Sequence, residues 1–334
     1  MVRPGHAVGW IRVYADKSLQ VVKQHLRTIY LDASCINKKL LKESFRYMQT
    51  FNRKFLRLAL SSLFSGVVGL TSLTGFAATD LNVCAGENEM PFSNSRLEGF
   101  ENRIAELVGN ALNRKVNYVF WKDARLIVRD NLDKNKCDLI IAVDSTDPRV
   151  LKTQPYYKSS YVFITREDRG IDISSWNDEL LKERNFRIGV LPDSPGKVML
   201  LQINRFDDMF DYFSEKQRYQ STRNKYVRVD PLEVMNDVGS GYIHAAMLWA
   251  PEVSRYIKQS PVPLKVEIVK DDAKKANGQP VPMHYEVAMG VRKDDVELQA
   301  ELDRVIAEKR DEIEAILKNE GIPLLPISTQ HSRK

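Results

Sequence analysis

The sequence of 334 residues predicts an α/β protein with two lobes. Short apolar runs alternate with amphipathic helical patterns over 81–143, and a second set of the same kind covers 186–269. A polar stretch at 166–183 separates the two sets, and an apolar run at 284–291 follows the second set as a returning strand. The cleft between two such lobes is the default place for a ligand.

The elements of the first set follow from the spacing of apolar residues. Phe100, Ile104 and Val108 recur at helical spacing, which predicts a helix from residue 100. A near-continuous apolar run at 138–143 is typical of a strand that is covered on both faces of a parallel sheet. The remaining expectations are strands over 81–85 and 116–120 and a helix over 122–132.

The second set begins with a strand and ends with the returning strand and a helix. The turn Asp193-Ser194-Pro195-Gly196 is expected to open a helix. A strand over 161–165 is expected before the polar stretch, and the strands expected after it cover 186–191, 225–229, 245–249, 264–269 and 284–291. Helices are expected over 231–238 and 251–258, and one final helix carries Leu298, Leu302, Val305, Ile306, Ile313, Ile316 and Leu317 on one side.

Residues 1–77 are expected to be a leader that is removed on export. The basic residues Arg53, Lys54 and Arg57 precede an uncharged stretch over 58–78, and Gly75-Phe76-Ala77 places small residues at a cleavage site. A membrane anchor is the alternative, but Ser, Gly and Thr interrupt the apolar stretch. We therefore expect a periplasmic protein with no stable membrane insertion after signal cleavage.

The first 47 residues are unusual before a secretory signal, whose basic region is normally short. Met48 begins a signal of ordinary length, so we expect translation to start there. An uncommonly long leader is the alternative.

The basic character of the whole chain comes from this leader. The chain has 50 Lys+Arg, 44 Asp+Glu and a net charge of +6. Residues 1–77 contain 12 of the basic and 3 of the acidic residues, which leaves 38 and 41, a net charge of −3, for the rest. The exported part is weakly acidic, so binding to nucleic acid is not expected.

Two cysteines remain after the leader, which contains Cys35. Cys84 and Cys137 are expected to form a disulfide, because disulfides persist in oxidising compartments. Two buried thiols are the alternative. Neither Cys has zinc-ligand spacing to a histidine, and we expect no metal site and no cofactor.

The sequence lacks the common catalytic signatures. No phosphate-binding glycine loop, GxSxG elbow, HExxH or CxxC pattern is present. This favours a binding protein over an enzyme.

Four segments, in this order and spacing, resemble the periplasmic solute-binding proteins of polar amino-acid importers. They are Pro91-Phe92-Ser93-Asn94, Gly99-Phe100-Glu101-Asn102, Cys137-Asp138-Leu139-Ile140-Ile141 and the segment from Pro155-Tyr156-Tyr157 to Phe163. The resemblance covers nearly all of residues 80–325. It implies the type II periplasmic-binding-protein fold, with two parallel-rich sheets joined by a two-strand hinge. Residues 78–165 and 284–334 would form lobe 1, and residues 166–283 lobe 2.

A narrower resemblance is to the methanol-oxidation J proteins. It adds Val83-Cys84-Ala85 and Ala246-Met247-Leu248-Trp249-Ala250-Pro251 to the segments above. The resemblance implies a non-catalytic periplasmic accessory protein that assists assembly or activation of a PQQ-dependent methanol dehydrogenase, its expected partner. The alternatives are a solute-binding protein that delivers a small ligand to an ABC importer, and an enzyme similar to the periplasmic dehydratases.

Two departures from the importer pattern bear on a ligand. Importers hold the ligand carboxylate with the Arg of a Thr-x-x-Arg segment, which Thr146-Asp147-Pro148-Arg149 matches in part. Importers also bind the ligand ammonium with a carboxylate, where this chain has Trp249 and Ala250. A free amino acid is therefore not favoured as a ligand. Binding of another small ligand in the cleft remains an alternative.

Eight residues are candidates for lining the cleft. Several have a structural alternative: Phe92 caps the loop, Arg149 is a surface residue, Tyr156 and Tyr157 pack at the hinge, Trp249 is buried in lobe 2, and Ser194 caps a helix rather than binding an anion. The candidates are Phe92, Ser93, Asn94, Thr146, Arg149, Tyr156, Ser194 and Trp249.

Overall fold

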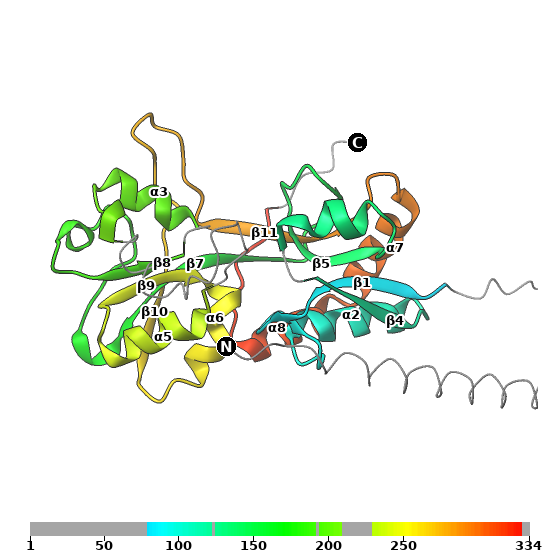
Figure 1. Cartoon of the computed structure of the whole chain (residues 1–334), viewed down its shortest axis with the longest axis horizontal. Coiled ribbons are helices and arrows are strands. Elements are labelled where there is room, and N and C mark those ends of the chain that lie inside the picture. Colours follow the sequence, from blue (N-terminus) through cyan, green and yellow to red (C-terminus); the bar gives the residue numbers. More distant parts are fainter. Residues whose placement is uncertain (1–78, 122–123, 192–193, 209–228, 329–334) are drawn as a thin grey trace, which may run out of the picture. The chain divides into compact units, whose positions relative to one another are not determined.

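The computed structural model describes residues 79–121, 124–191, 194–208 and 229–328 (Figure 1). The predicted leader and almost all of the strand predicted at 225–229 lie outside these residues. No helix in the described part is long and apolar enough to cross a membrane.

The first of the two larger hydrophobic cores is built from both ends of the described chain, and a third, smaller cluster contains Cys84 and Cys137. The segments that supply it are β1 (Leu81–Gly86), α2 (Phe100–Ala111), β4 (Val116–Trp121), β5 (Leu139–Asp144), β11 (His284–Val291), α7 (Val296–Glu308) and α8 (Arg310–Glu320). Phe100, Ile104 and Val108 are fully buried on one face of α2, as their helical spacing predicted. We call this set of buried residues, from Leu81 to Ile322, the first core.

The second core is built from one continuous stretch, Val162 to Met283. Its α-helices are α3 (Pro195–Gln202), α5 (Pro231–Ser240) and α6 (Ala250–Lys258), and its strands are β7 (Tyr157–Arg166), β8 (Ile188–Val190), β9 (Ala245–Trp249) and β10 (Leu264–Ile268). Two short 3₁₀ turns, Glu167–Arg169 and Glu179–Lys182, lie in the polar connection. The Asp230 carboxylate accepts a hydrogen bond from the Leu232 N–H and so begins α5.

Within the described residues, nine strands form one mixed sheet in the order β4-β1-β5-β11-β7-β9-β8, with β10 added on β7 and the short β6 (Leu151–Lys152) on β11. The short β2 (Asn88–Glu89) and β3 (Ser93–Asn94) pair with each other as a separate antiparallel sheet. Pairs β1–β4, β1–β5 and β8–β9 are parallel, whereas β7 and β11 make antiparallel pairs. Residues Tyr157–Ser160 of β7 pair with β11, and Tyr161–Thr165 pair with β9. The two predicted sheets are thus joined into one hydrogen-bonded path by β7 and β11, the two long strands at the centre of Figure 1.

Two expected helices differ from the prediction. Within 122–132, the described residues form a 3₁₀ turn, Ala124–Leu126, and a π-helical turn, Val128–Leu132. The final helix is divided at Lys309 into α7, which packs on β11, β6 and α2, and α8, which packs on α2 and α6.

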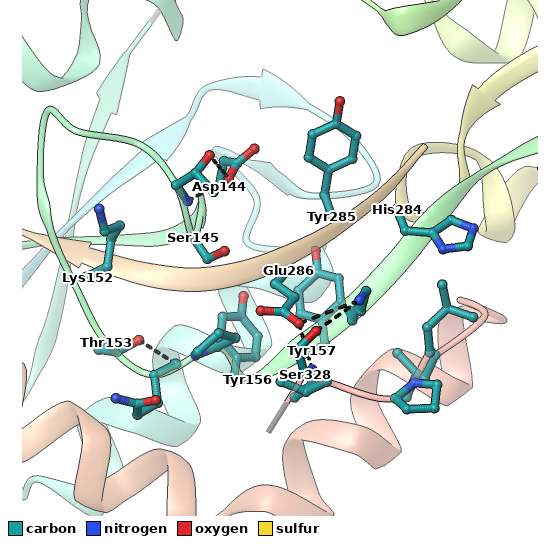
Figure 2. Close-up of a pocket in the computed structure, with 18 of the residues that line it drawn as sticks. Asp144, Ser145, Lys152, Thr153, Tyr156, Tyr157, His284, Tyr285, Glu286 and Ser328 are labelled. Atoms are coloured by element: carbon teal, nitrogen blue, oxygen red, sulfur yellow. Dashed lines mark hydrogen bonds and ion pairs between the residues drawn. The ribbon is translucent and has the colours of Figure 1, made fainter. Parts of the chain in front are cut away.

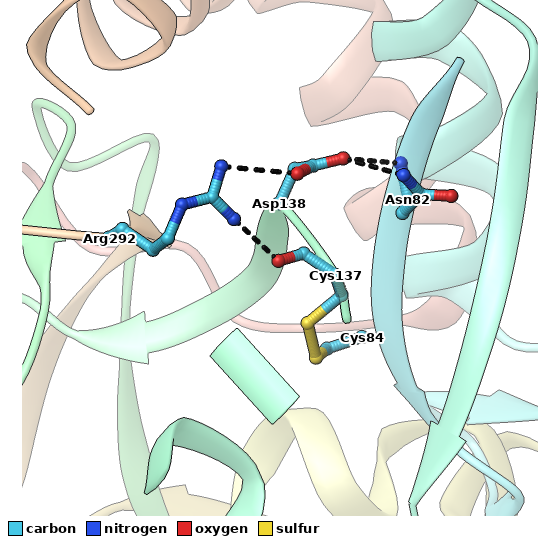
Figure 3. The surroundings of a disulfide bond; sticks show 5 residues. All are labelled: Asn82, Cys84, Cys137, Asp138 and Arg292. Atoms are coloured by element: carbon cyan, nitrogen blue, oxygen red, sulfur yellow. Dashed lines mark hydrogen bonds and ion pairs between the residues drawn. A yellow bond between two sulfur atoms is a disulfide. The ribbon is translucent and has the colours of Figure 1, made fainter. Parts of the chain in front are cut away.

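Cys84 and Cys137 form the predicted disulfide. It joins β1 to the residue two positions before β5, and Figure 3 shows the polar contacts around it. The Asp138 carboxylate accepts hydrogen bonds from Asn82, and Arg292 donates to Asp138 and to the Cys137 carbonyl. The start of β5 is therefore held to both β1 and the end of β11.

Candidate functional site

The Pro91–Asn94 loop is held by its own polar side chains. The Ser93 hydroxyl accepts a hydrogen bond from the Gly86 N–H (2.9 Å) and donates one to the Gly86 carbonyl (3.0 Å). The Asn94 amide oxygen accepts from the N–H groups of Arg96 and Glu98, and its Nδ2 donates to the Glu98 carboxylate. Both side chains are buried, so their polar atoms are engaged in forming the loop.

Phe92 packs against the first core. Its ring centroid lies 5.3 Å from that of Phe100, and its side chain is half-buried. The contact with Phe100 fits the interpretation in which Phe92 caps the loop.

The Asp144–Arg149 turn follows β5 and contains the partial Thr-x-x-Arg match. Asp144 accepts hydrogen bonds from both the N–H and the hydroxyl of Thr146. Arg149 donates to the Asp147 carboxylate through Nε and Nη2, at 3.0 and 2.7 Å. The hydrogen bond from Arg149 lowers the pKa of Asp147. Arg149, which matches the ligand-binding arginine of importers in part, is thus already paired with a carboxylate of its own chain.

A cavity of about 1040 Å³ lies against the two central strands (Figure 2). Of the eight predicted cleft residues it is lined by Thr146 and Tyr156; the other six do not line it. Its further lining comes from the Asp144 turn, from β7 and β11, and from the segment Leu324–Ser328. Tyr285 and Glu286 point to opposite sides of β11, as neighbours in a strand do.

Glu286 fixes the C-terminal segment to this cavity. Its carboxylate accepts a hydrogen bond from the Ser328 N–H (2.7 Å) and lies 3.6 Å from the Lys158 ammonium. Burial alone raises the pKa of Glu286, but the Ser328 bonds and the Lys158 charge outweigh it, and the net pKa is lowered.

Tyr156 and Tyr157 are packing residues at the start of β7. Both are buried, their ring centroids are 5.0 Å apart, and the Tyr156 hydroxyl donates to the Ile141 carbonyl. Burial raises the pKa of both phenols well above the usual value, so neither ionises near neutral pH.

Trp249 is the residue expected in the neighbourhood of the importers' ammonium-binding carboxylate. It ends β9, yet its half-buried indole packs against the first core. Its ring centroid is 5.3 Å from that of Tyr161 and 5.9 Å from that of Tyr285. We call Tyr161, Trp249 and Tyr285 the aromatic trio. Through this trio, Tyr161, which packs on the second core, contacts Trp249, which packs on the first core, and Tyr285 of β11.

Ser194 stands at the N-cap position of α3 without acting as a cap. Its hydroxyl donates to the Leu191 carbonyl (2.6 Å) and makes no side-chain cap bond to the helix. The hydroxyl is therefore used in the turn that precedes α3.

No sequence pattern predicted an ion-pair network around the buried Glu320 carboxylate. Glu320, at the end of α8, pairs with Arg103 of α2 and, at 2.7 and 2.9 Å, with Arg255 of α6. Arg255 also donates to the Glu98 carbonyl, and Lys258 donates to the Asn319 carbonyl. We call Arg103, Arg255 and Glu320 the junction network, because it links helices of the two cores. Charged residues on helices are usually solvated, so no sequence pattern marked this pairing.

The family can be assigned from residues 81–319. The profile of the bacterial extracellular solute-binding proteins, family 3, matches residues 81–319. The chain belongs to this family. The match includes every strand of the mixed sheet, and the predicted type II fold is confirmed.

Among its relatives, this family 3 protein is 41% identical to Protein MoxJ of Methylorubrum extorquens over 252 residues, which cover 75% of this chain and 83% of that protein. The crystal structure of MxaJ from Methlophaga aminisulfidivorans MPT has a TM-score of 0.69 and 39% identity, covering 73% of this chain and 100% of that one. The periplasmic binding protein XoxJ from Methylobacterium extorquens AM1 has a TM-score of 0.53 and 28% identity, covering 74% and 100%. The resemblance to the methanol-oxidation J proteins is confirmed.

Proposed function

We propose that this protein is a non-catalytic periplasmic accessory protein of a PQQ-dependent methanol dehydrogenase and assists its assembly or activation in methanol oxidation. The observation that supports this most is the 41% identity to MoxJ, which extends over 252 residues rather than over one motif. The export signal predicted in the leader and the extracellular family support a periplasmic location.

The residues at the two positions where importers bind the charges of an amino acid support a protein partner rather than an amino acid. Arg149 is paired with Asp147, and Trp249 replaces a carboxylate with apolar surface. A zwitterionic ligand needs an opposite charge for each of its own charges when it leaves water. In this proposal the faces around the cavity and the aromatic trio are contact surfaces for protein.

We further propose that the two cores mark two lobes, residues 78–165 with 284–334 and residues 166–283. The first core draws its buried residues from Leu81–Tyr157 and Val287–Ile322, and the second from Val162–Met283. The chain crosses between them only in β7 and in the segment before β11.

Capture from the periplasm of methanol-grown cells tests the accessory role. The tagged protein is expected to recover the large subunit of the dehydrogenase, and a deletion strain is expected to grow poorly on methanol. No recovery, together with normal methanol growth of the deletion strain, would overturn the proposal.

The second candidate function is delivery of a small polar solute to an ABC importer, favoured by the family and by the cavity of about 1040 Å³. A thermal-shift screen against amino acids and small organic acids separates the two functions. A bound solute raises the melting temperature with its concentration, whereas the accessory role predicts no shift.

A further inference from the structure

Strand β10 is an edge of the mixed sheet. It pairs with β7 alone, in the antiparallel register that sets Leu264 opposite Arg166 and Ile268 opposite Val162. Within residues 79–121, 124–191, 194–208 and 229–328, no strand pairs with its other side. An open edge presents main-chain donors and acceptors to any strand of matching pattern.

The hydrogen bonds to β7 show which residues face outward. Glu167 donates to the Pro263 carbonyl and Val269 donates to the Tyr161 carbonyl, so the odd-numbered residues of β10 bond to β7. Because the bonding direction alternates along an antiparallel strand, the N–H and carbonyl groups of Leu264, Val266 and Ile268 point away from β7. Among the residues that the structure describes, the main-chain groups of these three residues form the open edge.

The side chains along this edge are self-complementary. The strand reads Leu-Lys-Val-Glu-Ile, with apolar residues at both ends and at the centre and opposite charges at the two positions between. In an antiparallel pair of two copies centred on Val266, Leu264 faces Ile268 of the second copy, and Lys265 faces its Glu267. The charged pair falls at the non-hydrogen-bonded positions, where facing side chains are closest.

The exposure of the strand agrees with an uncovered surface. Val266 and Ile268 are 38% and 39% exposed, although both are β-branched aliphatic residues on the face that carries Val162 and Ile164. The Lys265 ammonium lies 3.3 Å from the carboxylate of Glu267 in its own strand and 3.0 Å from that of Asp172. Charges of both signs therefore lie along this strand.

Both ends of the strand limit the length of such a pair. Pro263 precedes it, and beyond it the Lys270 N–H donates to the Ser174 carbonyl of the same chain. The pairing surface is thus confined to the five residues of β10.

We propose that β10 is a homodimerisation edge, where two copies of this chain pair antiparallel about Val266 and extend the sheet across a two-fold axis. The interface is isologous, since each contact occurs twice. Its small size predicts a reversible dimer that forms at high protein concentration and is weakened by salt.

Charge reversal tests the register. The protein after signal removal is studied by sedimentation velocity over a range of concentrations, and a monomer–dimer equilibrium is expected. Lys265→Glu and Glu267→Lys each place like charges opposite one another twice, and each should weaken the dimer by about tenfold or more. The double variant K265E/E267K restores opposite charges across the interface and should restore the dimer.

Two further variants compare the β10 edge with a distant exposed position. Val266→Glu should also weaken the dimer, whereas Val296→Glu, at a 62% exposed residue on α7, should leave it unchanged. Far-UV circular dichroism and thermal unfolding confirm that each variant is folded. A wild-type monomer at every concentration, a dimer that ignores both single reversals, or a double variant that stays monomeric would overturn the proposal.

Discussion

The two cores differ in how the chain completes them. The second core uses one continuous stretch, whereas the first core needs β1, α2, β4 and β5 from the early part of the chain and β11, α7 and α8 from its end. The disulfide between Cys84 and Cys137 lies in the small third cluster and holds the start of β5 to β1, and both of these strands also supply the first core. The covalent bond therefore stabilises the half whose segments are farthest apart in sequence.

Removing the disulfide should have the largest effect and should fall on the first core. The bond links residues 53 apart, and the chain-entropy model gives about 4 kcal/mol for a loop of this length. The double variant Cys84→Ala/Cys137→Ala should lose about this free energy of unfolding in guanidinium chloride. Amide exchange should accelerate in β1 and β5 before β8 and β9, and equal acceleration in both cores would contradict this expectation.

A matched pair of leucine truncations asks whether the cores unfold separately. Leu139 of β5 and Leu248 of β9 are both fully buried, and each Leu→Ala change should cost about 3 kcal/mol. Leu139→Ala should raise amide exchange in the first core, and Leu248→Ala in the second. If either variant raises exchange equally in both, the cores form one cooperative unit.

The junction network joins the two cores, and removing its charge balance should lower the free energy of unfolding by less than the changes above. In Glu320→Gln the buried carboxylate, 6% exposed, no longer balances Arg103 and Arg255, which are partly solvated, and the expected loss is about 1–2 kcal/mol. Glu314→Gln on the same helix removes only a surface pair with Lys318 and should change stability by less than about 0.5 kcal/mol. Chemical denaturation measures the loss of stability in both variants. Equal losses would show that the junction network stabilises the protein no more than a surface ion pair does.

The smallest effect is a pH dependence confined to the second core. The His244 ring stacks on Phe186, and its Nδ1 accepts the Arg187 N–H. Burial, followed by the charges of Arg187 and Arg169, lowers the pKa of His244 below the value of about 6.5 for an unfolded chain. Its contribution to stability is therefore complete above pH 6.5 and is lost as the pH falls through the folded-state pKa.

The variant His244→Asn keeps an acceptor for the Arg187 N–H and cannot titrate. Thermal melts between pH 7 and pH 5 should show a smaller loss of stability in this variant than in the wild type. An identical pH profile would assign the dependence to other groups.

Patterns of apolar residues predicted most of the fold. The α2 face, β9, β10 and β11 follow from local periodicity, and the disulfide follows from the cysteine count in an exported chain. The break at Lys309 could not be predicted, because the apolar spacing of α7 continues into α8.

The site was harder to predict, because the role of a polar side chain depends on neighbours distant in sequence. Ser93 and Asn94 match the importer motif in type but bond to Gly86 and Glu98 of their own chain. Glu320 has no motif, and its importance comes from two arginines 217 and 65 positions away. Residue type at a motif position therefore says less than the partner that the fold supplies.

The most direct test of the central claim is methanol dehydrogenase activity in periplasmic extracts, expressed per amount of dehydrogenase large subunit. The accessory role predicts that a strain lacking this protein loses most of this activity or of the assembled enzyme, and that the wild-type chain restores it. Normal specific activity and normal enzyme amounts in the deletion strain would contradict it.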